Sequence, residues 1–310
     1  MEYRVLHGRT YHSAKGNTDY WEPNDEKQAN SMDLLHHTLT VLFDDKLFMA
    51  PISPEPKKVL DVGCGTGTWA IDFADAYPKC EVIGTDISPM QPHWVPVNLR
   101  FEIDNCTISP WTFAPNSFDF IHARYLFGAI RDWDALYAEM FRACKPGGWA
   151  EAVEPSIFIC SDDDSVCEGD GSALSAWAHL FREANHKYGA KSGQGPRPLD
   201  MLERDTILSG FRRAGFVDIV QRTVKCPLAP YSKDPRQREV GLYGRAAMEE
   251  GMEGFVLYLY IKGLGWSHEQ VTIYLSHLRR ELRDPRKTPY IKIQCVFGRK
   301  PLNVKSSDVR

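Results

Sequence analysis

Short apolar runs alternate with amphipathic stretches along most of the chain, and this pattern predicts alternating strands and helices. The runs that we expect to form strands are residues 59–62, 80–87, 99–105, 118–123, 149–154, 217–225 and 290–299. Helical patterns separate most of them, so we expect a parallel sheet with helices on both faces.

Apolar residues at three- and four-residue spacing mark the helices, which we expect at residues 29–43, 69–77, 133–144, 173–188, 202–214, 241–262 and 267–283. Asp132 is predicted to be the N-cap of the helix from residue 133. Ser267 and Gln270 have the spacing of a capping box. We expect Lys145-Pro146-Gly147-Gly148 to end the helix before it, because glycine accepts a left-handed turn.

The most informative stretch is Asp61-Val62-Gly63-Cys64-Gly65-Thr66-Gly67, which lies between a predicted strand and a predicted helix. Glycine permits positive φ angles and leaves room for a ligand where a Cβ atom would clash. The first turn of the following helix presents unpaired N–H groups. The turn is therefore expected to bind a polar ligand, and its G-x-G-x-G spacing differs from the G-x-G-x-x-G of nicotinamide and flavin enzymes.

Acidic residues end the next two predicted strands. Asp86 could accept hydrogen bonds from both hydroxyls of a ribose, and Asp104 could accept one from an adenine amino group. A single acid at such a position is more often only a solvated strand end. Three acids at one edge of a sheet, counting Asp61, favour a nucleoside site.

Together these motifs resemble class I S-adenosylmethionine-dependent methyltransferases. The segments that carry the resemblance are residues 61–67, Asp86, 104–112, 117–124 and 145–149. More narrowly, residues 10–301 resemble the fungal LaeA-like methyltransferases, including the segments 20–26 and 213–218 outside the cofactor half.

The resemblance implies a Rossmann-like α/β fold with a seven-stranded, mostly parallel sheet and an antiparallel last strand. It also implies S-adenosyl-L-methionine as the cofactor. The residues expected to bind it are Tyr20, Asp61, Gly63, Cys64, Gly65, Thr66, Gly67, Trp69, Asp86, Ile87, Asp104 and Asn105.

We expect residues 1–50 to form an N-terminal helical lid, residues 51–301 the methyltransferase domain, and residues 302–310 a flexible tail. A helical insertion at about residues 235–285 precedes the last strand. Since the cofactor occupies the first strands, substrate selection is expected in residues 11–48 and 241–283, which are rich in aromatic residues.

A sulfonium methyl group is already electrophilic, so the protein mainly has to align the reacting atoms and exclude water. The expected catalytic residues are His122, Arg124 and Glu154, at the ends of the fourth and fifth strands, with Glu151 nearby. The alternative for His122 is a structural hydrogen bond beneath the cofactor. Arg124 could equally orient an acidic substrate or hold the cofactor carboxylate. Tyr20, His36 and His37 are further site candidates.

Composition excludes several classes of function. The net charge of -4 and the pI near 6.2 give no basic face for nucleic acid. The longest strongly apolar run, residues 255–261, is too short to span a bilayer, and the first residues lack the apolar core of a signal peptide. The eight cysteines stand singly, so we expect reduced thiols inside the cell and no metal site. The acidic triplet at residues 162–164 is interpreted as a solvated loop.

Two functions from different classes remain. The first is a cytoplasmic methyltransferase that acts on an oxygen or nitrogen atom of a small molecule in fungal secondary metabolism. The second, implied by the resemblance, is a nuclear regulator that works in a complex with velvet proteins. A third possibility is that the fold holds the cofactor without methyl transfer. The sequence specifies neither the substrate nor the oligomeric state.

Overall fold

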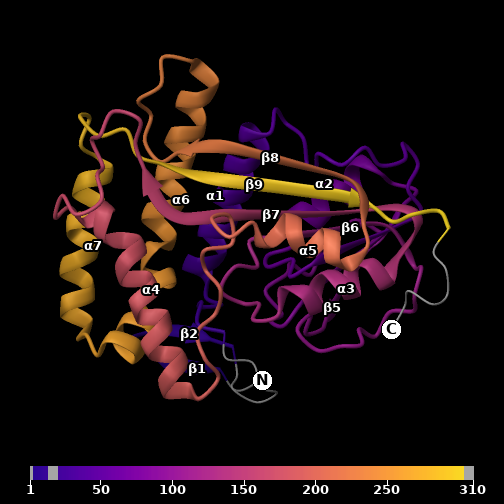
Figure 1. The fold of residues 1–310 in the computed structure, drawn as a ribbon, viewed down its shortest axis with the longest axis horizontal. Coiled ribbons are helices and arrows are strands. Elements are labelled where there is room, and N and C mark those ends of the chain that lie inside the picture. The colour runs from indigo at the N-terminus through magenta and orange to yellow at the C-terminus, as the bar shows by residue number, and fades with distance from the viewer. Residues whose placement is uncertain (1–2, 13–19, 304–310) are drawn as a thin grey trace. The chain divides into compact units, whose positions relative to one another are not determined.

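The computed structural model describes residues 3–12 and 20–303, which fall into two compact units (Figure 1). Unit 1 comprises Met1–Asp45, Ser156–Leu199 and Val224–Lys292, and unit 2 comprises Lys46–Pro155, Asp200–Thr223 and Ile293–Arg310. Residues 304–310, most of the expected tail, lie outside the described residues. The grouping of residues 156–199 with the N-terminal segment was not anticipated from the sequence.

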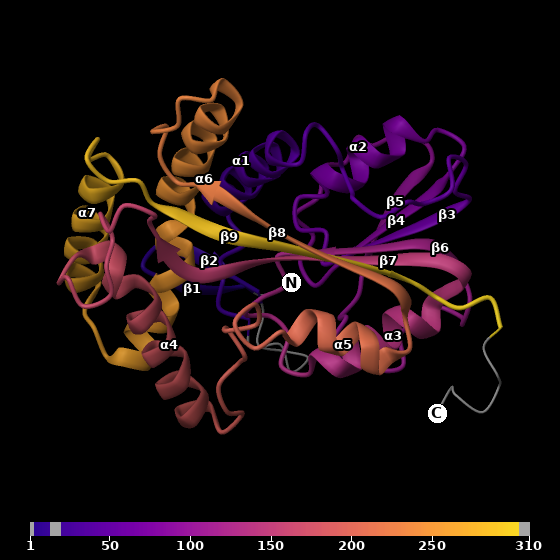
Figure 2. The same cartoon turned by 45° about the horizontal axis from the view of Figure 1, so that its top comes forward.

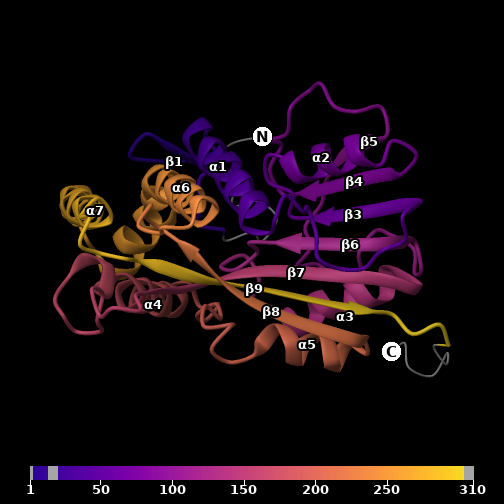
Figure 3. The same cartoon turned by 90° about the horizontal axis from the view of Figure 1, so that it is seen from above.

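A seven-stranded sheet has the strand order β5-β4-β3-β6-β7-β9-β8. The strands are β3 Lys58–Val62, β4 Glu81–Asp86, β5 Leu99–Ile103, β6 Phe118–Arg124, β7 Cys144–Cys160, β8 Val217–Pro227 and β9 Tyr290–Arg299. Strands β3 to β7 pair in parallel, whereas β9 runs in the opposite direction between β7 and β8 (Figure 3). The predicted fold class and all seven predicted strands are confirmed, but β7 continues to Cys160, so Glu154 does not end its strand as predicted.

Three helices of unit 2 flank this sheet: α2 Thr68–Ala76, α3 Trp133–Ala143 and α5 Thr206–Ala214. Helix α2 lies on one face, and α3 and α5 lie on the other (Figure 2). The predicted N-cap of α3 is confirmed, because the Asp132 side chain accepts a hydrogen bond from Ala135 N. Helix α5 begins later than predicted, since Asp205 has a left-handed φ of 54° that no helix can continue through.

The predicted end of α3 is correct to within one residue, but its predicted cause, a glycine stop, is wrong. The helix stops at Ala143, and Cys144 is already extended and begins β7. Gly147 does have a left-handed φ of 82°, but its N–H donates to Lys300 O, and Lys300 N donates to Gly148 O. Pairing with the end of β9 therefore fixes this glycine segment, rather than a helix stop.

Unit 1 is mainly helical. Its elements are the hairpin β1 Arg4–Leu6 and β2 Arg9–Tyr11, the helices α1 Glu26–Leu42, α4 Ala173–Ser192, α6 Pro235–Leu259 and α7 His268–Leu282, and the π-helix η1 Tyr260–Leu264. The hairpin was not predicted, because two three-residue strands are too short to show a period. The capping box of α7 is confirmed by the reciprocal bonds of Ser267 and Gln270. No helix among residues 3–12 and 20–303 is long and apolar enough to cross a membrane.

Helices α1 and α6 lie close together because glycines of α6 face α1. A Cβ atom on Gly251 would lie 2.3 Å from Ser31 Oγ, and one on Gly254 would lie 2.2 Å from Gln28 Oε1. The Ser31 hydroxyl donates across the contact to Ala247 O at 3.1 Å. This packing fixes α1, the helix predicted from the sequence to cover the cofactor.

In unit 2, the ring of Phe101 on β5 occupies the space beside two glycines. A Cβ atom would lie 2.3 Å from Phe101 Cζ if placed on Gly67 and 2.6 Å from Phe101 Cδ1 if placed on Gly84. Phe101 therefore holds β4, β5 and the start of α2 in register.

This contact gives a test of the packing. Gly84→Ala should lower the free energy of unfolding by about 1–3 kcal/mol, because the added methyl group overpacks the site. Adding Phe101→Leu should recover part of the loss, since a smaller side chain makes room. Urea denaturation of the single and double variants measures both effects. An unchanged midpoint in Gly84→Ala would show that the site relaxes freely.

Candidate functional site

The glycine turn joins β3 to α2 through three residues with left-handed backbones. Gly63, Gly65 and Gly67 have φ angles of 66°, 57° and 82°. Gly67 is the N-cap of α2, and no side chain caps the helix. The first turn of α2 therefore keeps N–H groups available for a polar ligand, and the partial positive charge of the helix end favours a negative one.

Protein side chains account for two of these glycines. A Cβ atom on Gly63 would lie 2.4 Å from Leu126 Cδ2, and one on Gly67 would meet Phe101. Sequence reasoning assigned this space to an approaching ligand. At these two positions, internal packing is already enough to require glycine.

Asp86 ends β4 and fixes the turn through backbone groups. Its Oδ2 accepts a hydrogen bond from Gly65 N, and its Oδ1 accepts one from Ser88 N, both at 2.9 Å. Burial raises the pKa of Asp86 to about 6 although these bonds favour the ionised form. Each oxygen has a further lone pair, so the carboxylate can still accept from hydroxyl groups.

Gln91 was missed by sequence reasoning. Its Nε2 donates to Gly65 O at 2.6 Å and to Ser88 O at 3.1 Å, which ties the segment after β4 to the glycine turn. Ile87, a predicted cofactor residue, lies half-buried in this segment. A glutamine five residues after a strand end matches no sequence motif, so Gln91 could not be identified from the sequence.

Asp104 and Asn105 lie beside Asp86, as predicted. Asp104 N donates to Asp86 O at 3.0 Å, and the Asp104 carboxylate accepts from Asn105 N and from Thr112 Oγ1. The Asn105 side-chain oxygen accepts from Thr107. The turn residues Cys64 and Thr66 are half-buried, and Cys64 N donates to Thr85 O, so the sheet edge brings the predicted glycine and acid motifs together.

Beneath the turn, Asp61 and His122 form a buried pair. His122 Nδ1 lies 2.8 Å from Asp61 Oδ1, and the two side chains face each other across β3 and β6. The imidazole stacks on the Trp69 indole with ring centres 3.8 Å apart. Trp69 is 2% exposed, and its Nε1 donates to Leu47 O. These contacts favour a supporting role for His122 and Trp69 over direct contact with a ligand.

Glu154, predicted as a catalytic residue, is fully buried in β7. Its Oε1 accepts a hydrogen bond from Leu126 N and its Oε2 accepts one from Phe127 N. Burial raises the pKa of Glu154 to about 8. Both oxygens therefore hold the loop after β6, and a role as a general base stays a prediction.

Arg124 is the last residue of β6, directly before Tyr125, whose φ of 57° turns the chain. Burial lowers the pKa of Arg124, while the charges of Asp61 and Glu151 oppose the shift. Its guanidinium therefore lies in the same negative environment as the buried pair. Both roles considered from the sequence, with a substrate or with the cofactor, stay open.

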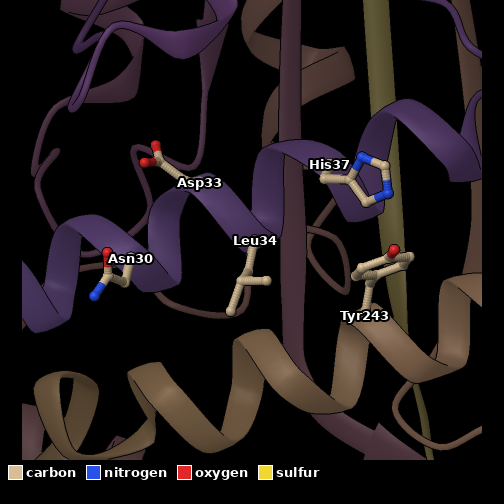
Figure 4. Close-up of a pocket in the computed structure, with 5 residues that line it drawn as sticks. All are labelled: Asn30, Asp33, Leu34, His37 and Tyr243. Carbon is tan, nitrogen blue, oxygen red and sulfur yellow. The ribbon is translucent and has the colours of Figure 1, made fainter.

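The predicted site residues Tyr20, His36 and His37 belong to unit 1. Tyr20 O accepts from Arg4, and His36 is buried in α1. His37 lies 4.2 Å from the Tyr243 ring and lines an open hollow of about 570 Å³ between α1 and α6 (Figure 4). Asn30, Asp33 and Leu34 complete its lining. The role of Tyr20 in cofactor binding stays a prediction.

The described residues contain no group of three or more histidine, cysteine or acidic side chains able to hold an ion. In the acidic triplet, Asp162 pairs with Lys225, and Asp163 accepts from Thr288. These contacts tie the loop to unit 1.

Comparison with known proteins identifies the type of domain. The model of a family described as "Methyltransferase domain" matches residues 34–221. This range contains the glycine turn, Asp86, Asp104 and His122.

Three curated fungal proteins are similar to the chain over most of its length. "Methyltransferase pytC" of Aspergillus terreus is 35% identical over 91% of this chain and 83% of its own. "Secondary metabolism regulator LAE1" of Cochliobolus heterostrophus is 32% identical over 95% and 94%. "Protein-methionine methyltransferase laeA" of Emericella nidulans is 32% identical over 97% and 77%.

The buried carboxylate in β7 predicts a pH dependence of stability. The pKa of Glu154 rises from 4.5 to about 8 on folding, so between these values the folded protein binds a proton that the unfolded chain releases. The free energy of unfolding should therefore fall as the pH rises from 5 to 8.

Glu154→Gln removes this titration. The free energy of unfolding of the variant should therefore fall less steeply with pH than that of the unaltered protein, and the two slopes should differ by up to about 1.4 kcal/mol per pH unit. Urea denaturation at pH 5, 6.5 and 8 gives both slopes. Comparing slopes cancels any constant loss of stability in the variant and the titration of other groups, including His12, whose pKa is lowered by burial. Equal slopes would contradict the shift.

Proposed function

The chain belongs to the S-adenosylmethionine-dependent methyltransferase family, in its fungal LaeA-like group, and we propose that it methylates an oxygen or nitrogen atom of a small molecule in fungal secondary metabolism. The observation that carries the proposal is the junction of Asp86 with Gly65. It joins a strand-end acid to a glycine turn at the start of an uncapped helix. That combination suits a nucleoside with a polar, charged extension.

The residues at this edge fit the cofactor. In the proposal, Asp86 accepts from the ribose hydroxyls, and Asp104 and Asn105 meet the adenine. The glycine turn and the first turn of α2 offer N–H groups to the amino acid part, near Asp61. Two features support the fit: α2 lacks a capping side chain, and the Asp86 oxygens retain acceptor capacity.

When bound, S-adenosylmethionine supplies an electrophilic methyl group, so the residues of this chain need to orient and shield rather than activate. His122 holds the Asp61 side chain by a hydrogen bond, and Trp69 supports His122 by stacking on it. Glu154 fixes the loop after β6, at the strand ends where an acceptor would approach. A proton from the acceptor would leave to a nearby base or to water.

For the acceptor, the proposal assigns selection to residues 11–48 and 241–283, which belong to unit 1 except for residues 46–48. Aromatic side chains from these two segments meet within that unit. Tyr11 and Tyr258 have ring centres 5.3 Å apart, and His37 meets Tyr243 in the hollow of Figure 4. Rings with polar tips are typical of pockets for organic molecules.

A second candidate function is that of a regulator with a protein acceptor. Two relatives at 32% identity carry the names of a secondary metabolism regulator and a protein-methionine methyltransferase. The relative named simply as a methyltransferase is 35% identical. These values are too close to choose between the two functions, so an experiment has to do so.

An experiment with labelled S-adenosylmethionine distinguishes the small-molecule function from the regulator function. The protein is incubated with the small-molecule fraction and, separately, with the protein fraction of a fungal extract, and the products are followed by mass spectrometry. We expect label in small molecules of the first fraction. Label confined to proteins would support the regulator instead, and no label in either would favour a fold that holds the cofactor without transfer.

The cofactor site has its own test. Asp86→Asn should weaken binding of S-adenosylhomocysteine by about 1.5–3 kcal/mol, the range for hydrogen bonds to a charged group. Asp119→Asn is the matched control, because Asp119 also accepts two backbone N–H groups, from Lys57 and Lys58, but at the start of β3. Calorimetry should show unchanged affinity in the control. Equal affinities in all three proteins would refute the site.

A further inference from the structure

We propose that Glu151 is a positioning residue for the cofactor site, acting through the connector at residues 46–52 and through Trp69. The proposal goes beyond the proposed function but rests on it, because it presumes that the cofactor binds beside Asp61. It begins with the burial of Glu151, which is 1% exposed in the middle of β7.

Glu151 clamps the connector by backbone groups alone. Its Oε2 accepts hydrogen bonds from Met49 N at 2.7 Å and from Ala50 N at 2.8 Å. Among the described residues no N–H or O–H group donates to its Oε1, and the Cys295 thiol donates to the carboxyl group. Burial raises the pKa of Glu151 to about 7 against the effect of both N–H groups. Burying a carboxyl group is unfavourable, so its presence at this position indicates a specific role.

The same connector is held from its other side by α2. Leu47 O accepts a hydrogen bond from Trp69 Nε1 at 2.7 Å. Two elements therefore hold three residues of the connector: Glu151 holds Met49 and Ala50, and Trp69 holds Leu47. Movement of the connector would take away the polar partner of the indole.

The Trp69 indole is connected to Asp61 through His122. It stacks on His122 with an interplanar angle of 4°, and His122 bonds to Asp61. His122 is also the register partner of Glu151 on the neighbouring strand β7, as it is of Asp61 on β3. Side-chain contacts thus link Glu151 through the connector and Trp69 to His122 and Asp61, and the pairing of β6 with β7 closes the ring.

A closed ring predicts coupled effects. Glu151→Ala releases the connector, and Trp69→Phe removes the N–H donor while keeping a ring on His122. Each should weaken S-adenosylhomocysteine binding by about tenfold, the size of one lost hydrogen bond. The double variant should be little worse than either single one, because both break the same ring. Glu151→Gln should restore most of the affinity, since its amide oxygen can still accept from the connector.

Calorimetry on the full chain tests this, with thermal unfolding measured in parallel. The control is Asp119→Ala, which also removes an acceptor of two backbone N–H groups in unit 2. We expect it to lower thermal stability and leave the affinity unchanged. The proposal is overturned if Asp119→Ala weakens binding as much, if the two single effects add in full, or if Glu151→Gln binds no better than Glu151→Ala. Absence of binding in the unaltered protein would instead refute the proposed function.

Discussion

Carboxyl groups on strands of the sheet hold the loops at one sheet edge by accepting hydrogen bonds from backbone N–H groups. Asp86 holds the glycine turn, Glu154 holds the loop after β6, and Glu151 holds the connector before β3. Removing such a polar group from water is costly unless donors replace the solvent. Since a loop that moves away leaves its carboxylate unpaired, each loop has one favourable position.

This constraint shapes the chemistry. Glu154 and Glu151, the acids considered for proton transfer, accept hydrogen bonds from backbone N–H groups of the loops. His122 is held between Asp61 and Trp69. A methyl donor that already carries its own electrophile makes few demands for acid or base catalysis and many for alignment. An edge whose loops are held by carboxyl groups fits that demand. In the proposed function, specificity is left to unit 1, whose aromatic residues come from separate segments of the chain.

Local patterns in the sequence were enough for much of the fold and for part of the site. The seven strands, the glycine turn, Asp86 and Asp104 follow from apolar periodicity and strand-end position, which neighbouring residues determine. The partners of Glu151 could not be found this way, because Met49 lies 102 residues earlier in the chain. Gln91 was missed for the same reason, and Gly147 was misassigned because its partner strand ends at Lys300.

In the proposed function, one edge of the sheet, with the glycine turn and the two strand-end acids, receives the cofactor. Hydrogen exchange of the backbone amides, measured with and without S-adenosylhomocysteine, reports on that edge directly. We expect slower exchange at residues 63–68, 86–91 and 104–107 when the ligand is bound. Protection that appears only around the hollow between α1 and α6, with these three segments unchanged, would contradict it.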